Sequence, residues 1–107
     1  MTSLIYLAAP LFTQAEVAFN QSLADQLTAA RYSVYLPQQQ CAGTTDPREL
    51  FDICIRGLDS ASMVLVILDG TDADSGSCFE VGYTFKLKTF SSWACGQILG
   101  VVANIWE

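Results

Sequence analysis

The chain has 107 residues, a length that fits one domain and leaves no room for a second. Its net charge of −6, with only five Lys and Arg residues, argues against a nucleic-acid partner, because phosphate backbones are bound by clustered basic side chains. The chain has no His, which excludes His-based catalytic triads and the commonest zinc sites, so acid–base chemistry must rest on carboxylate, Tyr, Lys or Cys side chains.

The first two predicted elements are a buried strand and an amphipathic helix. The apolar run over residues 4–8 has the length of a strand, and Pro10 ends it. Thr13 and Glu16 have the spacing of a capping box, so a helix over residues 14–30 should begin after Thr13. Its expected apolar face recurs at helical spacing and consists of Phe19, Leu23, Leu27 and Ala30.

A second strand and a second helix follow, separated by a polar loop. Residues 33–36 predict the strand, and residues 38–46 predict the loop. Asp46 as the cap, Pro47 at the first helical position and Glu49 completing a capping box together predict a strong helix start. The apolar face of this helix is expected to contain Leu50, Cys54, Ile55 and Leu58.

A third strand–helix unit completes the pattern. Residues 63–68 form a continuous apolar run, typical of a central strand buried on both faces, and residues 75–88 predict another helix. Strands and helices in this order imply right-handed crossovers. We therefore expect a single-domain, doubly wound α/β fold, Rossmann-like or flavodoxin-like, with a mostly parallel sheet of about five strands. Ligands bind such sheets beyond the carboxyl ends of the strands.

Three segments at the predicted strand ends carry a recognisable pattern. They read Tyr6-Leu7-Ala8-Ala9-Pro10-Leu11-Phe12, Leu36-Pro37-Gln38, and Leu68-Asp69-Gly70 followed by the run Asp74 to Tyr83. In order and spacing they resemble the Y-L-A-G-P-L-F, L-P-Q, L-D-G and D-S-G-x-x-x-E-x-G-Y elements of nucleoside 2-deoxyribosyltransferases. Ala9 departs from the family pattern, which has Gly there, and places a methyl group where the backbone approaches the ligand.

The resemblance implies transfer of 2-deoxyribose between purine or pyrimidine bases without a cofactor. The expected ligands are a 2′-deoxynucleoside and a free nucleobase. Glu80 matches the glutamate that attacks the anomeric carbon and forms a covalent deoxyribosyl-enzyme. Asp69 matches the aspartate that takes part in proton transfer to or from the base.

The resemblance also implies a set of substrate-binding residues. Asp74 matches a residue that bonds the sugar hydroxyls, Gln38 a glutamine that recognises the base, and Tyr6 a tyrosine beside the nucleophile. Ala9 and Gly70 lie in the matching backbone segments. Without the resemblance, the same residues have ordinary interpretations. Glu80 is then a solvent-facing helix residue, Asp69 a turn former before Gly70, and Asp74 a helix cap.

Two other functions remain open at this stage. The family resemblance extends to N-glycosidases that hydrolyse deoxynucleoside 5′-monophosphates, with water in place of the acceptor base. Those enzymes need a phosphate-binding cluster, and the sequence offers no obvious one. The other alternative is a truncated, catalytically inactive nucleoside-binding fragment, which the C-terminal end of the chain favours.

The expected family-like domain spans residues 1–89, and residues 90–107 form a divergent tail. The family continues with a strand and a G-L-R-T-D-F-R-like loop, beyond which residues complete a neighbouring subunit's pocket. Permitted codons for residues 90–100, read from the third base, allow the translation Q-F-L-G-L-R-T-D-F-R. We hypothesise that the tail comes from a frameshifted message, and an uninterrupted gene with incompatible codons near codon 89 contradicts this. Alternatively, residues 97–105 form another strand.

The remaining features concern compartment and assembly. The chain has four Cys residues without a C-x-x-C pair, and its apolar N-terminal run is too short for a signal peptide or a membrane span. We therefore expect a cytoplasmic protein with free thiols, no metal site and no membrane contact. A composition that is 51% hydrophobic and 15% charged favours a homo-oligomer. The four Cys residues are Cys41, Cys54, Cys78 and Cys95.

Overall fold

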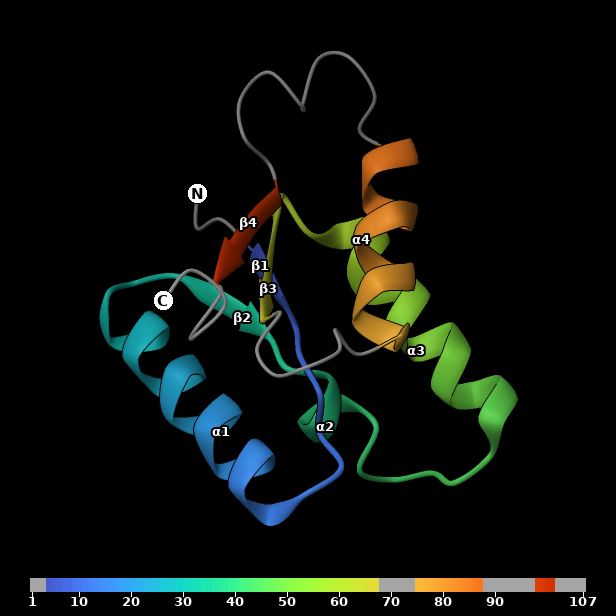
Figure 1. Ribbon diagram of the computed structural model, residues 1–107, viewed down its shortest axis with the longest axis horizontal. Coiled ribbons are helices and arrows are strands. Elements are labelled where there is room, and N and C mark those ends of the chain that lie inside the picture. The colour runs from blue at the N-terminus through green and yellow to red at the C-terminus, as the bar shows by residue number, and fades with distance from the viewer. Residues whose placement is uncertain (1–3, 68–74, 88–97, 102–107) are drawn as a thin grey trace.

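The computed structural model describes residues 4–67, 75–87 and 98–101. Strands and helices alternate along these residues (Figure 1). The strands are β1 (Leu4–Ala8), β2 (Ser33–Tyr35), β3 (Met63–Ile67) and β4 (Ile98–Val101). The helices are α1 (Gln14–Ala29), α2 (Pro37–Gln40), α3 (Pro47–Ser60) and α4 (Ser75–Leu87). Within the described ranges, every helix is too short or too polar to cross a membrane.

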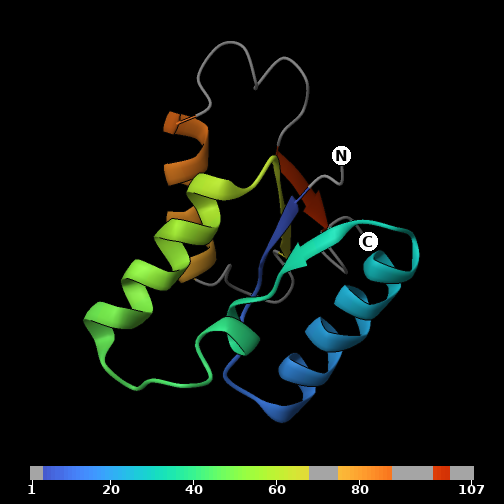
Figure 2. The ribbon, with the colours of Figure 1, turned by 180° about the vertical axis from the view of Figure 1, so that it is seen from behind.

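The strands form one sheet in the order β2-β1-β3-β4, and every neighbouring pair is parallel. α1 lies on one face of the sheet, and α3 and α4 lie on the other (Figures 1 and 2). This arrangement confirms the doubly wound α/β fold. The strand order is the flavodoxin-like one, in which the chain switches faces between β1 and β3. About five strands were expected, and four are present in the part of the chain that the structure describes.

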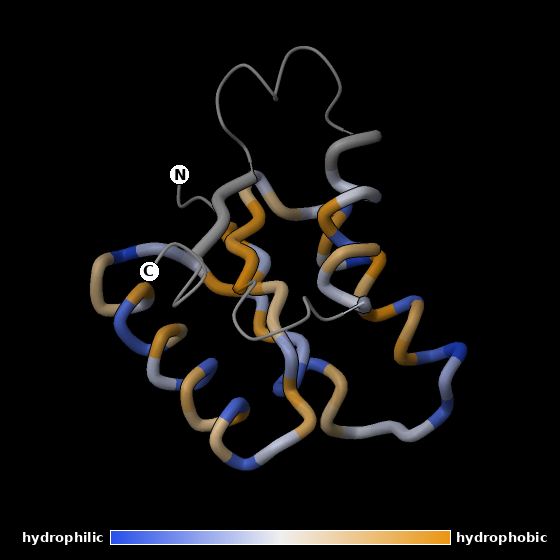
Figure 3. Tube along the Cα trace, in the orientation of Figure 1, coloured by the Kyte–Doolittle hydropathy of each residue, from blue (hydrophilic) through white to orange (hydrophobic). Residues whose placement is uncertain are grey.

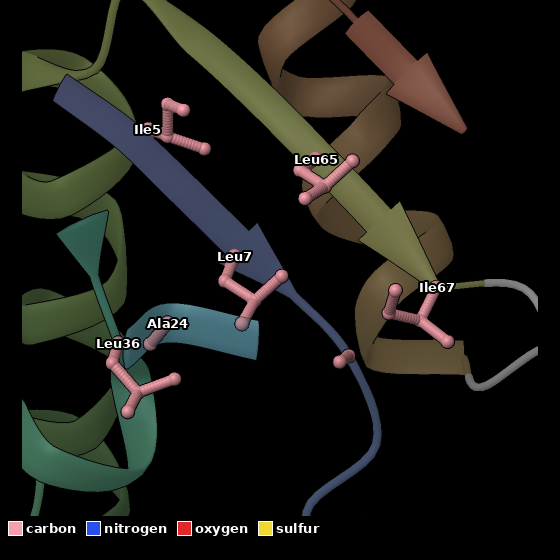
Figure 4. Close-up of a cluster of buried hydrophobic side chains, with 7 residues drawn as sticks. Ile5, Leu7, Ala24, Leu36, Leu65 and Ile67 are labelled. Carbon is pink, nitrogen blue, oxygen red and sulfur yellow. The ribbon is translucent and has the colours of Figure 1, made fainter. Parts of the chain in front are cut away.

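β1 and β3 are buried on both faces, so their side chains alternate between two hydrophobic clusters. The tube in Figure 3 is hydrophobic along these central strands. On the α1 face, shown in Figure 4, the cluster contains Ile5, Leu7, Ala9, Ala24, Leu36, Leu65 and Ile67. On the α3 and α4 face it contains Tyr6, Ala8, Leu58, Ala61, Val64 and Val66.

The start of α1 confirms the predicted capping box. The Thr13 hydroxyl accepts a hydrogen bond from the Glu16 N–H at 3.1 Å, and the Glu16 carboxylate accepts one from the Thr13 N–H at 2.9 Å. The predicted apolar face is wrong in part, because Phe19 is 51% exposed and Ala30 is exposed as well. The helix turns Asn20 inward instead, on the same stripe as the partly or fully buried Leu23, Ala24 and Leu27.

The segment after β2 differs from the predicted loop over residues 38–46. Residues 37–40 form α2, a single helical turn with Leu36 as N-cap. Pro37 occupies the first helical position, where its fixed φ suits a helix and its missing N–H is not needed. The same proline that ends β2 therefore starts a helix.

The predicted start of α3 is confirmed for its cap but not for its capping box. The Asp46 carboxylate accepts a hydrogen bond from the Arg48 N–H at 3.0 Å. The Glu49 carboxylate does not accept a hydrogen bond from the Asp46 N–H. The Thr44 hydroxyl instead accepts from the Asp46 N–H at 3.1 Å and donates to Glu49 at 2.5 Å. The Thr44 hydroxyl thus bridges the Asp46 N–H and the Glu49 carboxylate, two groups that a capping box joins directly.

The strand suggested for residues 97–105 is present over residues 98–101 as β4. It pairs in parallel with β3, with Leu65 opposite Leu99, and gives β3 a neighbour on each side. A central position for β3 agrees with its continuous apolar sequence. The domain boundary expected near residue 89 lies outside the described residues.

Close packing of α3 on the sheet depends on Gly57. The Tyr35 ring covers this residue, and its hydroxyl donates to the Ile53 carbonyl at 2.7 Å. A Cβ atom built on Gly57 stands 2.3 Å from Tyr35 Cε1 and 2.5 Å from Cδ1, so the ring must move if a side chain is added. Tyr35 also stacks on Tyr6, so this displacement reaches the centre of the sheet.

We expect Gly57→Ala to lower the free energy of unfolding by about 1–3 kcal/mol, because overpacking forces the half-buried Tyr35 ring off its position. Gly82→Ala in α4 is the matched control, since nothing lies within 4 Å of its added Cβ. That control should be neutral or stabilising by up to about 1 kcal/mol, the helix propensity difference between Gly and Ala. Urea unfolding of both variants measures the two effects, and equal stability of the two proteins contradicts the packing argument.

Candidate functional site

The carboxyl ends of β1 and β3 mark the switch point of the sheet. The chain leaves β1 toward α1 on one face, and α4 lies on the opposite face against β1 and β3. In Figure 1 the N-terminal ends of α1 and α4 and the whole of α2 lie at the arrowhead end of the strands. Open α/β sheets bind their ligands at such a point.

Tyr6 and Glu80 meet on the α4 face of the sheet, below these strand ends. The Tyr6 side chain is fully buried within β1, and its hydroxyl donates a hydrogen bond to Glu80 Oε2. The two residues are 74 positions apart in the sequence. The Tyr6 ring stacks on Tyr35 of β2, with the ring centroids 5.5 Å apart and the planes at 14°. The structure thus brings together two residues of the predicted site.

Burial raises the pKa of the Tyr6 hydroxyl far above its ordinary value, and the negative charge of Glu80 and the hydrogen bond to it act in the same direction. Tyr6 therefore stays protonated at every pH at which the protein functions. A permanently protonated hydroxyl can only donate to the carboxylate, so Tyr6 fixes the position of Glu80 Oε2. The arrangement holds a carboxylate in place beside the ligand-facing edge of the sheet.

α4 presents Glu80 to the sheet through its buried face. Ser77 and Thr84 are buried on that face, three residues before and four residues after Glu80. The Thr84 hydroxyl donates to the Glu80 backbone carbonyl at 2.8 Å, so this buried polar group is satisfied within the helix. Small side chains at these two positions let α4 approach the strands closely.

Contacts with α3 hold the other side of α4. The Tyr83 hydroxyl donates to Asp59 at 2.9 Å. The Phe79 ring lies between those of Phe51 and Tyr83, with centroid distances of 6.1 and 6.2 Å. Phe79 and Tyr83 flank Glu80 in the sequence, so these contacts set the rotation of the helix about its axis. That rotation determines where the Glu80 carboxylate lies.

Two cysteines that were not among the predicted site residues adjoin the Tyr6–Glu80 pair. Cys54 of α3 contacts the Tyr6 hydroxyl and the thiol of Cys41, which caps the C-terminus of α2. Burial, Cys54 and the charge of Glu80 together raise the pKa of the Cys41 thiol to about 11. Cys41, Cys54 and Cys78 are free thiols, as predicted, and Cys95 lies outside the described residues.

Gln38 lies on the other face of the same edge, with α1. Its Oε1 accepts a hydrogen bond from Asn20 Nδ2 at 3.2 Å, and its Nε2 donates to the Val17 carbonyl at 2.9 Å. Asn20 Nδ2 also donates to the Pro10 carbonyl at 3.0 Å. Asn20 was not among the predicted site residues, although a polar residue on the same helical stripe as Leu23 and Leu27 is a detectable signal.

The other predicted site residues have different outcomes. The Ala9 methyl group packs in the hydrophobic cluster on the α1 face. Asp69, Gly70 and Asp74 lie outside the described residues, and their roles stay predictions.

Comparison with known proteins agrees with this geometry. The sequence model described as "Nucleoside 2-deoxyribosyltransferase" matches residues 5–96. No curated protein sequence matches the chain. A solved structure of a conserved protein from Enterococcus faecalis V583 is 25% identical, with a TM-score of 0.71 over 80% of this chain and 58% of that one.

Other solved structures share the fold at lower identity. A 2-deoxyribosyltransferase from Bacillus psychrosaccharolyticus has a TM-score of 0.77 at 16% identity, over 94% of this chain and 72% of that one. The enzyme from Leishmania mexicana has a TM-score of 0.76 at 17% identity, over 95% and 65%. This chain therefore spans less than two thirds of the Enterococcus and Leishmania proteins.

The family match covers most of the sequence, and the fold that it implies is the one observed. The chain belongs to the nucleoside 2-deoxyribosyltransferase family.

Proposed function

We propose that this protein transfers 2-deoxyribose between nucleobases, with Glu80 as the nucleophile. The observation that supports the proposal is the hydrogen bond from the buried Tyr6 hydroxyl to the Glu80 carboxylate, in a chain of this family. Two proteins of the same fold are 2-deoxyribosyltransferases by name. Self-association and a cytoplasmic location stay predictions.

The proposed reaction has two displacement steps. Glu80 attacks C1′ of the deoxynucleoside, a C1′–O ester bond forms, and the C1′–N bond breaks with its electron pair going to the base. The leaving base takes up a proton, for which Asp69 is the proposed donor. A nitrogen of the incoming base then attacks C1′, releases the Glu80 carboxylate and gives up its proton to the Asp69 carboxylate, which restores the acid for the next cycle. Two inversions retain the configuration at C1′.

Tyr6 contributes to this reaction through the position of the carboxylate. Its hydrogen bond to Glu80 Oε2 keeps the carboxylate against the sheet and fixes its orientation for attack on C1′. Cys41 is a poor candidate for the nucleophile, because a thiol with a pKa of about 11 carries almost no thiolate at neutral pH. Glu80 is therefore the proposed nucleophile on chemical grounds as well.

Hydrolysis is the second candidate. The CMP N-glycosidase BcmB from Clostridium botulinum shares the fold, with a TM-score of 0.67 at 10% identity over 95% of this chain and 90% of that one. The same nucleophile serves both reactions, since water in place of the second base converts transfer into hydrolysis. The assay below distinguishes them by product.

The first prediction concerns Glu80. The protein, incubated with a 2′-deoxynucleoside and a different free base, should form the new deoxynucleoside, and Glu80→Gln should lower kcat at least about a thousandfold, as the loss of a nucleophile does. Asp52→Asn, an equivalent change at an exposed position of α3, is the control and should keep full activity. Chromatography of the products measures exchange.

Mass spectrometry should also detect a deoxyribosyl adduct on the peptide that contains Glu80. Undiminished exchange by Glu80→Gln contradicts the proposed nucleophile. Free base and deoxyribose without exchange assign the protein to the hydrolases, and a folded protein without turnover supports the inactive-fragment alternative.

The second prediction concerns Tyr6. Tyr6→Phe should lower kcat about 10- to 100-fold with little change in KM, because a hydrogen bond to a charged group contributes about 1.5–3 kcal/mol. Tyr32→Phe removes the same hydroxyl from an exposed ring and should leave kcat unchanged. Steady-state kinetics of both variants make the comparison. A rise in KM at constant kcat contradicts a role in holding the nucleophile.

The third prediction concerns Cys41. Its rate of alkylation by iodoacetamide in the folded protein should rise up to about pH 11, because only the thiolate reacts and burial raises the pKa of this thiol. In the urea-unfolded chain the rate should level off about two pH units lower, near the ordinary value. Peptide mass spectrometry identifies the labelled residue, and circular dichroism at each pH verifies the fold. Identical profiles in both states contradict the placement of Cys41.

A further inference from the structure

Asn20 is a polar side chain in an apolar position. It is 3% exposed and lies on the inward stripe of α1, where Leu23, Ala24 and Leu27 pack on the sheet. A helix that needed only to pack there would carry an aliphatic residue, because burying an amide costs free energy unless its hydrogen bonds are made. Within the described residues, the Asn20 amide instead bonds the Pro10 carbonyl and Gln38, which follow β1 and β2.

These bonds join the segments that follow two neighbouring strands. Asn20 Nδ2 donates one proton to the Pro10 carbonyl, beyond β1, and the other to Gln38 Oε1, beyond β2. Gln38 Nε2 donates in turn to the Val17 carbonyl, one helical turn before Asn20. We call these three hydrogen bonds among Pro10, Val17, Asn20 and Gln38 the amide clamp.

Two backbone carbonyls determine the orientation of both amides in the clamp. A carbonyl only accepts, so the atom of Asn20 that faces Pro10 must be the nitrogen, and the atom of Gln38 that faces Val17 must be the nitrogen as well. Gln38 Oε1 is then opposite an Asn20 proton. Rotating the Gln38 amide by 180° sets two nitrogens against each other at one end and two oxygens at the other, so one orientation is strongly preferred.

The clamp leaves part of the Gln38 amide for a ligand. A carboxamide has two N–H protons and two oxygen lone pairs, and within the described residues the clamp uses one of each. Gln38 is half-buried, so the side chain is not sealed into the core. The remaining N–H and lone pair form a donor–acceptor pair of the kind that matches the hydrogen-bonding edge of a nucleobase.

We propose that Asn20 is a positioning residue that fixes the donor–acceptor orientation of the Gln38 amide, and thereby influences which nucleobase the protein binds. The inference rests on the proposed function, because only a base-binding site gives Gln38 a base to recognise. Asn20 itself need not touch the ligand. It acts through Gln38 and through the Pro10 backbone.

The test uses a double-mutant cycle of Asn20→Ala and Gln38→Ala. Dissociation constants of the four common 2′-deoxynucleosides and their free bases are measured by NMR titration for the wild type, both single variants and the double variant. Asn20→Ala should weaken binding of the preferred base about tenfold, as the loss of one or two net hydrogen bonds does, and reduce the discrimination among bases. In the Gln38→Ala background the same change should have little further effect.

Two additional variants separate positioning from simple stability. Asn20→Asp keeps the shape of the side chain but cannot donate, so it should lose base discrimination at least as strongly as Asn20→Ala. Gln26→Glu makes the same amide-to-carboxylate change on the exposed side of α1 and should bind every base as the wild type does. An effect of Asn20→Ala that is equally large with and without Gln38 overturns the inference, because a purely structural residue behaves that way.

A measurement on the wild type keeps the test valid if the Asn20 variants do not fold. The Gln38 side-chain proton bonded to Val17 should exchange slowly with solvent, and added base should shift the other proton of that amide. Fast exchange of both protons, or no binding of any base or deoxynucleoside, overturns the inference. The Glu80 assay judges the proposed function separately. If the wild type transfers deoxyribose but Asn20→Ala binds every base as the wild type does, the proposed function holds and this inference fails. If base binding depends on Asn20 but no transfer occurs, this inference holds and the proposed function fails.

Discussion

A phenol hydroxyl at the centre of a parallel sheet needs a hydrogen-bond partner, and the geometry of this protein is built around that need. Tyr6 lies in β1, which has β2 on one side, β3 on the other and helices on both faces. Water cannot satisfy its hydroxyl there, since the side chain is fully buried. The partner is Glu80 of α4. The hydrogen bond forms only when α4 packs on the sheet, so the packing of this helix also determines the position of the carboxylate.

The same requirement explains the side chains around the pair. Ser77 and Thr84 are small enough for α4 to lie close to the strands, and Thr84 keeps its hydroxyl bonded within the helix. Tyr35 stacks on Tyr6 and is itself received by the side-chain-free surface of Gly57. The position of a single carboxylate thus depends on contacts from two strands and two helices.

The two faces of the sheet carry polar networks of different character. On the α4 face, a hydroxyl that only donates meets a carboxylate, which suits a group that reacts. On the α1 face, two neutral amides and two backbone carbonyls form the clamp, which suits a group that recognises a ligand without reacting. The first network joins β1 to α4, and the clamp joins the segments that follow β1 and β2, which are neighbours in the sheet.

Several features were predicted correctly because they depend on residues that are close together in the sequence. Apolar runs identified β1 and β3, the Thr13–Glu16 pair identified the start of α1, and Asp46 followed by Pro47 identified the start of α3. These signals involve residues within one turn of each other, so the folded chain has little freedom to change them. The family pattern added Glu80, Tyr6 and Gln38, because its motifs keep their spacing along the chain.

Some failures arose where a local motif leaves more than one outcome open. The Thr44 hydroxyl bonds both the Asp46 N–H and the Glu49 carboxylate in place of the direct capping-box bond, and Pro37 begins a helical turn where a loop was expected. Asn20 replaced Phe19 on the buried face because the rotation of α1 is set by what it meets at the strand ends. The sequence alone thus determined the elements, the fold class and the family, since these follow from periodicity and local motifs. Only the tertiary structure decided that Tyr6 bonds Glu80 and that Asn20 holds Gln38, because partners 74 and 18 residues apart meet only once the helices have packed on the sheet.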